Sequence, residues 1–170
     1  MNESQSHPCY RAPKIAALAV LTVMAGAPAL LRAQSAPPQD LATYPRTQLT
    51  VRPQSSPDKT LTFSVWVADT PARAEQGLMF VRDLPETMGM VFPLVPPRVE
   101  NMWMKNTYIE LDMLFVGADG KVTKIIERAR PLSLDNLSSD KPVSAVLELR
   151  GGSAQRLGLK VGDRVSWKKS

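Results

Sequence analysis

The sequence predicts a mainly β domain with two short helices, built either as a sandwich or as a partly closed barrel. Three observations predict it: about seven short apolar or alternating segments, turn-forming residues between them, and only two segments with helix start and stop signals. Many short strands separated by turns are typical of these two architectures. We find no internal repeat in the sequence.

The first strands are expected before residue 70. Residues 47–52 can form a strand, and residues 53–58, rich in proline and serine, a turn. In residues 61–67, large apolar side chains recur at every second position, which is the period of a half-buried strand.

A short helix is expected over residues 71–76. Thr70 is placed to cap it, Pro71 suits the first helical position because its missing N–H needs no partner there, and Gly77 can take the left-handed conformation that ends it. Residues 89–92 then form a brief apolar run between prolines, which favours an edge or short strand, and the proline-rich residues 93–98 are expected to be a loop.

Two extended runs, residues 99–104 and 109–116, flank the polar residues 105–107. This pattern predicts a hairpin-like reversal or a sharp bend at the polar residues. A tight turn at residues 117–120 should lead into another strand at residues 121–127.

The C-terminal part should contain a long loop, two strands and the second helix. Residues 129–142 have loop composition, and residues 145–149 read as a strand. Residues 153–157 can form one or two helical turns closed by Gly158, before a last strand at residues 164–168.

Residues 1–33 have the pattern of an export signal peptide. Arg11 and Lys14 precede an uncharged apolar run, residues 15–31, and we expect cleavage after Ala33. The pattern predicts an exported, periplasmic protein without stable membrane insertion once the signal is removed. An uncleaved signal would instead remain as an N-terminal membrane anchor.

The remaining chain divides into a spacer and one domain. Residues 34–46 are rich in Ala, Pro, Gln and Ser and have almost no large apolar side chain, so we expect a flexible spacer. Residues 47–170 are then a single β-rich domain. Its net charge, about +3 by residue count, is spread without a basic stripe, which argues against nucleic-acid binding.

Cys9 and His7 are the chain's only cysteine and histidine, and both lie within the expected signal. The mature domain would therefore lack thiolates, imidazoles and the usual ligands of zinc. This excludes catalysis of the Ser-His-Asp and Cys-His kinds. We accordingly assign no catalytic residue, no metal site and no cofactor from the sequence.

The most distinctive segment of the chain reads Met102-Trp103-Met104-Lys105-Asn106-Thr107-Tyr108-Ile109-Glu110-Leu111-Asp112-Met113. It resembles the W-M-K-N-T-x-I-x-L-D signature of the family known as domain of unknown function 192, also called the uncharacterised ACR family. Met102 and Glu110 depart from the aromatic residue and the proline that this family often has there. The Lys-Asn-Thr and Asp positions agree.

The resemblance covers roughly residues 61–165 and includes further short motifs in the family's order. These motifs lie at residues 69–71 with 77–79, 89–92, 119–122 and 158–165. The resemblance implies a compact β fold similar to a jelly-roll-like sandwich. It implies no particular activity, because the family has none that is settled.

The candidate site from the sequence is a polar cluster in this segment: Trp103, Lys105, Asn106, Thr107 and Asp112. One hypothesis is that Lys105 pairs with Asp112 in a partly dry place and holds a ligand or acts as a base. The other is structural: Asn106 and Thr107 supply the hydrogen bonds of a bend, and Asp112 accepts from backbone amides while pairing with Lys105.

The polar cluster and the absence of a catalytic set lead to a first functional hypothesis. It is a non-enzymatic module of the cell envelope that binds a small ligand or an envelope protein. The alternative is a hydrolase or lyase acting on an envelope carbohydrate or peptide, through Asp112 with Lys105 or a glutamate. The glutamates considered are Glu75, Glu86, Glu100 and Glu110.

A further alternative is a carrier of copper(I), since methionine thioethers bind soft metals. The methionines in question are Met79, Met88, Met90, Met102, Met104 and Met113. Several of them stand beside Leu, Val and Phe in strand-like runs, where methionine commonly fills gaps in a core. Trp66 and Trp103 could likewise line a binding face or pack between layers.

Overall fold

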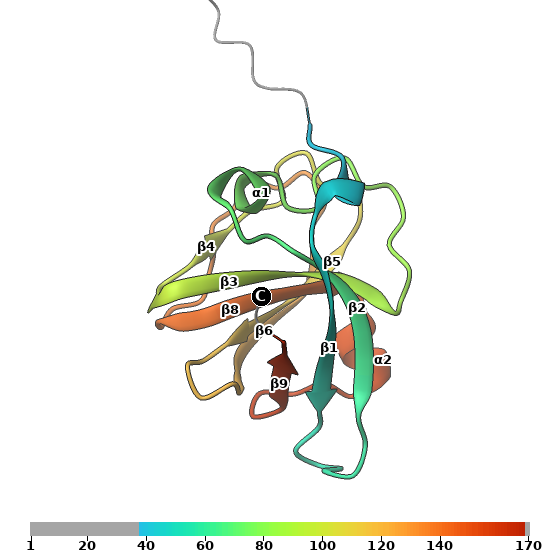
Figure 1. Ribbon diagram of the computed structural model, residues 1–170, viewed down its shortest axis with the longest axis vertical. Coiled ribbons are helices and arrows are strands. Elements are labelled where there is room, and N and C mark those ends of the chain that lie inside the picture. Colours follow the sequence, from blue (N-terminus) through green and yellow to red (C-terminus); the bar gives the residue numbers. More distant parts are fainter. Residues whose placement is uncertain (1–37, 169–170) are drawn as a thin grey trace, which may run out of the picture. The chain divides into compact units, whose positions relative to one another are not determined.

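Seven strands form one curled sheet in the order β6-β5-β8-β3-β2-β1-β9 (Figure 1). The computed structural model describes residues 38–168, so the expected signal peptide at 1–33 lies outside the described residues. The strands of the large sheet are β1 (Arg46–Arg52), β2 (Leu61–Val67), β3 (Met88–Arg98), β5 (Leu111–Val116), β6 (Val122–Ala129), β8 (Val143–Arg150) and β9 (Arg164–Trp167). Neighbouring strands are antiparallel except for the parallel pair β2 and β3.

The two edges of this sheet meet at the beginning of β6 and β9. Lys121 and Arg164 form an antiparallel bridge, and the N–H of Val122 donates to the carbonyl of Asp163 at 2.9 Å. The N–H of Val165 donates to the carbonyl of Gly120 at 2.8 Å. Of the two predicted architectures, the partly closed barrel is therefore the one that forms.

Short elements cover both sides of the sheet. They are a 3₁₀ helix η1 (Leu41–Thr43), the helices α1 (Pro71–Gln76) and α2 (Ser153–Leu157), and a small second sheet of β4 (Asn101–Met102) with β7 (Leu137–Ser138). Figure 1 shows α1 and β4 on one side of β3 and β8, with β9 and α2 on the other side.

The alternation of side chains in β8 separates two hydrophobic clusters. Leu147 and Leu149 face the inner cluster, which lies inside the curl of the sheet with residues from β1, β2, β5, β6, β9 and α2. Val146 faces the outer cluster, which packs between β3, β5 and β8 and the segments that cover them. Opposite faces of one sheet thus support two different environments.

Local signals predicted several elements correctly. The strand over Leu61–Val67 and both helices have the predicted bounds. The Thr70 side chain accepts from the N–H of Arg73 at 3.3 Å, and Gly158 ends α2 in the left-handed conformation with φ of 70°. These features depend on neighbouring residues only, so sequence patterns identify them.

The loop predicted at residues 93–98 is wrong, because β3 continues to Arg98 and lies between β8 and β2. Its prolines are tolerated for a physical reason. Strand β2 pairs only with Met88 to Val91, and the pairing with β8 is interrupted between Pro93 and Arg98. A proline in that part of the strand removes no ladder hydrogen bond.

The hairpin predicted between residues 99–104 and 109–116 does not form. Strand β4 pairs with β7, whereas β5 pairs with β6 and β8. The polar residues between them make a sharp bend instead: Asn106 has a positive φ of 55°, and the N–H of Thr107 donates to the carbonyl of Met104 at 3.1 Å. The residues predicted as one long loop, 129–142, include the short strand β7.

The described part of the predicted spacer makes ordered contacts. Asp40 caps η1 by accepting from the N–H of Ala42 at 2.9 Å, and the ring of Tyr44 is buried in the outer cluster. The guanidinium of Arg73 lies 5.3 Å from the centre of that ring. One aromatic side chain attaches this segment, which an average over its composition does not reveal.

Candidate functional site

The side chain of Asp112, on β5, is fully buried on the side of the sheet that faces α2. Its Oδ1 accepts from the N–H groups of Arg128 at 2.8 Å and Gly152 at 2.9 Å. Its Oδ2 accepts from the N–H of Ala154 at 2.7 Å. One carboxylate therefore joins the end of β6, the turn after β8 and the first turn of α2, and hydrogen bonds to a charged acceptor are the stronger kind.

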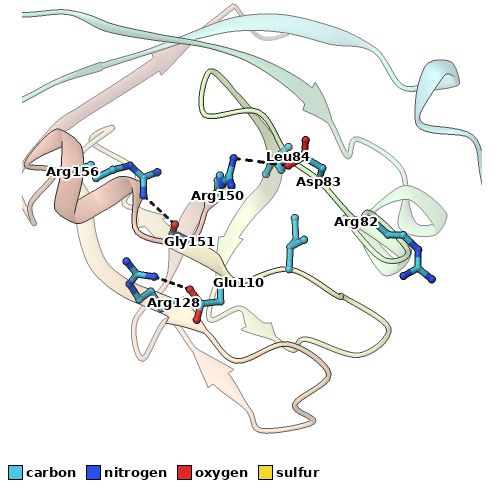
Figure 2. A pocket seen from close by; sticks show the side chains of 9 residues that line it. Arg82, Asp83, Leu84, Glu110, Arg128, Arg150, Gly151 and Arg156 are labelled. Atoms are coloured by element: carbon cyan, nitrogen blue, oxygen red, sulfur yellow. Dashed lines mark hydrogen bonds and ion pairs between the residues drawn. The ribbon is translucent and has the colours of Figure 1, made fainter.

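The segments that Asp112 joins form one wall of a cleft of about 360 Å³ (Figure 2). Four arginines from separate segments reach it, together with two acidic side chains. The lining residues are Arg82, Asp83, Leu84, Ile109, Glu110, Arg128, Arg150, Gly151 and Arg156. Four cations against two anions leave this lining with a formal charge of +2.

Ion pairs hold three of the guanidinium groups in place without enclosing them. Arg128 Nη1 lies 2.8 Å from Glu110 Oε2, and Arg150 Nη1 lies 3.8 Å from Asp83 Oδ1. Arg156 Nη2 lies 3.1 Å from Glu86 and 3.2 Å from the hydroxyl of Ser153. All three arginines stay about half exposed, so such pairs orient the side chains more than they stabilise the fold.

Two glycines in the turn after β8 permit this crowding. A Cβ at Gly151 would collide with Glu110. A Cβ at Gly152, where φ is +80°, would lie 2.7 Å from Arg128 Nη2 and 2.9 Å from Arg156 Nη1. Two like-charged guanidinium groups thus lie close to the same point beside Gly152. Such an arrangement is favourable when an anion lies between them.

The remaining residues of the sequence-predicted cluster lie elsewhere. Among the described residues Lys105 forms no ion pair with Asp112; its amine lies 5.2 Å from the centre of the Trp103 ring. The Thr107 hydroxyl donates to the carbonyl of Lys105 at 3.3 Å, and the carbonyl of Asn106 accepts from the N–H of Phe80 at 2.9 Å. The structural hypothesis was right about the backbone partners of Asp112, and the predicted pairing with Lys105 was wrong.

Comparison with known proteins identifies the family. The family model described as DUF192, uncharacterized ACR, matches residues 53–167. The chain belongs to the DUF192 family. No curated protein matches it.

Two crystal structures are similar to this DUF192 chain. One, from Sinorhizobium meliloti 1021 and described as a candidate transcription regulator, is 40% identical, with a TM-score of 0.70; the match covers 73% of this chain and 95% of the other. The second, a protein of unknown function from Novosphingobium aromaticivorans DSM 12444, is 40% identical with a TM-score of 0.68, covering 72% and 85% of the two chains. Both support the fold of the DUF192 domain.

The sequence interpretation missed a second buried acid of the DUF192 domain. Glu148 lies in β8, two residues before its end, opposite Met90 on one side and Met113 on the other. It is 4% exposed, and its Oε2 has no hydrogen-bond partner. Burial raises the pKa of Glu148 from 4.5 to about 8. The available signal was a charged residue inside the otherwise apolar run of residues 145–149.

Glu148 faces a small cavity of about 20 Å³ beneath the signature segment. Trp103 and Thr107 line this cavity, with Met79 and Met102. The residues of the polar cluster, which are close in the sequence, therefore lie in two places in the structure. Trp103 and Thr107 cover Glu148 on the outer face, whereas Asp112 supports the arginine cleft from the other face.

The four glutamates of the hydrolase hypothesis lie at different places in the structure. Glu110 and Glu86 pair with arginines at the cleft, Glu100 pairs with Arg98, and Glu75 lines the small cavity. Asp112 is enclosed, so it cannot reach a substrate as the hydrolase hypothesis requires.

Two further properties concern residues 38–168 as a whole. Within them no group of three or more His, Cys, Asp and Glu side chains could hold a metal ion. None of the helices in that part of the DUF192 chain has the length and apolar character needed to cross a membrane.

Proposed function

We propose that this domain is a non-enzymatic binding module of the cell envelope that takes a small anionic ligand, carrying phosphate or carboxylate groups, in the arginine cleft. The observation that carries the proposal is the convergence of Arg128, Arg150 and Arg156 on one concave surface (Figure 2). Arg82 also lines this surface, with its guanidinium 4.7 Å from the centre of the Tyr108 ring. The lining has a formal charge of +2, or +1 when Glu86, the partner of Arg156, is counted with it. The planar guanidinium group matches the geometry of both anions and stays charged at any relevant pH.

The size and chemistry of the cleft support binding of a small molecule. Its volume of about 360 Å³ falls within the range of small-molecule sites. The lining residues include no serine, threonine, lysine or tyrosine, and both acidic ones are ion-paired. This set is suited to holding an anion and offers no nucleophile for a reaction on it. The envelope location rests on the export-signal pattern of residues 1–33.

Titration calorimetry with pyrophosphate and with citrate tests the proposal. We expect at least one of these probes to bind one to one, with affinity that falls as salt is added. Arg128→Gln and Arg156→Gln should each weaken binding about tenfold or more, because each removes charge-assisted hydrogen bonds worth about 1.5–3 kcal/mol.

Arg98→Gln is the matched control. Arg98 is also half exposed and ion-paired, with Glu100, but it lies opposite Val143 at the far end of β8 from Arg150. Equal losses in Arg98→Gln and Arg128→Gln would mean nonspecific attraction and contradict the proposal. The relative from Sinorhizobium meliloti is described as a candidate transcription regulator. Tight binding of duplex DNA, with no binding of either small anion, would therefore replace our proposal with a nucleic-acid function.

A further inference from the structure

The methionines of the described chain gather on one side of the large sheet. Met90, Met104 and Met113 belong to the outer cluster, and Met88 and Met102 pack against it. The sixth, Met79, lines the cavity below Trp103. The inner cluster, with fifteen buried residues, contains no methionine. Methionine used only as a gap-filler has no reason to avoid one of two cores of similar size.

Glu148 lies at the centre of this methionine-rich side. Its direct cross-strand neighbours are Met90 and Met113. Its Oε2 is buried without a hydrogen-bond partner, although leaving a buried polar atom in this state destabilises a fold. Nothing in the inner cluster, where Asp112 has three donors, resembles this. An unsatisfied acceptor of this kind indicates a missing partner.

The cavity beside Glu148 limits the size of that partner. At about 20 Å³ it has room for one water molecule or one monatomic ion. Its lining contains two carboxylate residues, Glu148 and Glu75, and two thioethers, those of Met79 and Met102, but no lysine or arginine. This balance favours a cation over an anion.

The ligand types select the kind of cation. Magnesium and calcium require six or more oxygen ligands, and thioether sulfur is a poor ligand for either. Soft monovalent ions of the copper(I) kind prefer thioethers, and a single carboxylate neutralises their charge on burial. We propose that Glu148, Met79 and Met102 form a binding site for one soft monovalent cation, copper(I) or its analogue silver(I). This site is separate from the arginine cleft, so neither proposal depends on the other.

Trp103 and Thr107 give the signature segment a role at this site. Both line the cavity, and Trp103 is 47% exposed on its outer side. Lys105 lies over the exposed indole instead of entering the cavity. The segment therefore forms the thin cover between the ion and solvent, and the left-handed Asn106 shapes its bend.

Silver(I) titration of a parent chain, the full chain with Cys9→Ser and His7→Gln, tests the site in chloride-free buffer with a probe that undergoes no redox reaction. The two substitutions remove the thiol and the imidazole, which would otherwise bind silver themselves, and every variant below carries them. Calorimetry and native mass spectrometry should show one silver ion per chain. Glu148→Gln keeps the shape of the side chain and removes its charge, and we expect it to lower the silver affinity at least about tenfold. Met79→Leu and Met102→Leu should each lower it by a similar factor, because leucine has no donor atom.

Met88→Leu is the matched control, since Met88 packs against the same cluster but does not line the cavity. The silver affinity of this variant should equal that of the parent chain. Absence of silver binding to the parent chain, which lacks Cys9 and His7, overturns the proposal. So does an equal loss in Met88→Leu and Met79→Leu, which would indicate unspecific thioether binding. If Glu148→Gln fails to fold, as shown by circular dichroism, the methionine variants still decide, because Met-to-Leu changes are well tolerated.

Discussion

Asp112 Oδ1 accepts a hydrogen bond of 2.8 Å from the backbone N–H of Arg128, so a buried carboxylate fixes the residue whose guanidinium enters the cleft. Arg128 has a positive φ of 48°, at a point where the register of β5 and β6 shifts. The aspartate of the family signature thus does not line the cleft. It holds the backbone of a residue that does, Arg128.

The first prediction concerns Asp112→Asn. The amide has only one acceptor oxygen, and its NH₂ group would face at least one of the three N–H donors. We expect the free energy of unfolding to fall by about 2–4 kcal/mol, measured by urea denaturation. Asp58→Asn, in an exposed turn, should change it by less than about 0.5 kcal/mol. Equal stability of the two variants would contradict the role given to Asp112.

The second prediction compares two glycines with similar backbone strain. Gly152 and Gly158 both have positive φ, of 80° and 70°. Alanine at either position should cost about 1–2 kcal/mol in unfolding free energy. Only at Gly152 would the new Cβ meet guanidinium groups, because nothing lies within 4 Å at Gly158.

Pyrophosphate titration of these two variants separates the effect of backbone strain from the effect of displacing the guanidinium groups. We expect Gly152→Ala to weaken anion binding at least about fivefold, because Arg128 and Arg156 must both move. Gly158→Ala should bind as the wild type does. A similar affinity in both variants would show that the two guanidinium groups are not needed together.

The sequence was sufficient where structure depends on neighbouring residues. Thr70 and Pro71 begin a helix by their own chemistry, and the alternation over residues 61–67 identifies a strand. The prolines led to a wrong prediction for β3, because a proline disrupts a strand only where its N–H would pair with a neighbouring strand. Which residues of β3 pair with β2 and β8 is set by the folded sheet, so the local sequence does not reveal it.

The candidate sites were harder to predict because they join distant segments. Arg82, Arg128, Arg150 and Arg156 look dispersed in the sequence, and only the folded sheet brings them to one cleft. Asp112 was correctly expected to accept from backbone amides, but its donors lie 16 to 42 positions away. Proximity in sequence predicts Lys105 as the partner of Asp112, but the bend between them changes the chain direction, and the Lys105 amine lies over the Trp103 ring instead.

The third prediction tests the bend of the signature segment. Asn106 has a φ of 55°, which asparagine and glycine adopt with little strain and alanine does not. We expect Asn106→Ala to lower the free energy of unfolding by about 1 kcal/mol and Asn106→Gly by less than about 0.5 kcal/mol. Urea denaturation of both variants measures the difference. Equal losses in the two variants would mean that the Asn106 side chain, which both of them lack, matters more than its backbone conformation.

The fourth prediction concerns the pH dependence that Glu148 gives to stability. The native state raises the pKa of this carboxyl to about 8 from 4.5, so between these values it keeps a proton that the unfolded chain releases. The free energy of unfolding should therefore decrease as pH rises through this window, by up to about 1.4 kcal/mol per pH unit, and become level above about pH 8. Below pH 4.5 both states hold the proton and the slope disappears.

Glu148→Gln isolates this effect from every other titrating group, because only the difference between wild type and variant is compared. Glutamine mimics the protonated acid, so we expect the two proteins to be similarly stable near pH 5 and the variant to be more stable near pH 8. Urea denaturation at each pH, without added metal, gives the comparison. Parallel curves would mean that Glu148 is solvated or paired in solution, and a variant less stable at pH 8 would mean that its charged form has a partner which the fold alone does not supply.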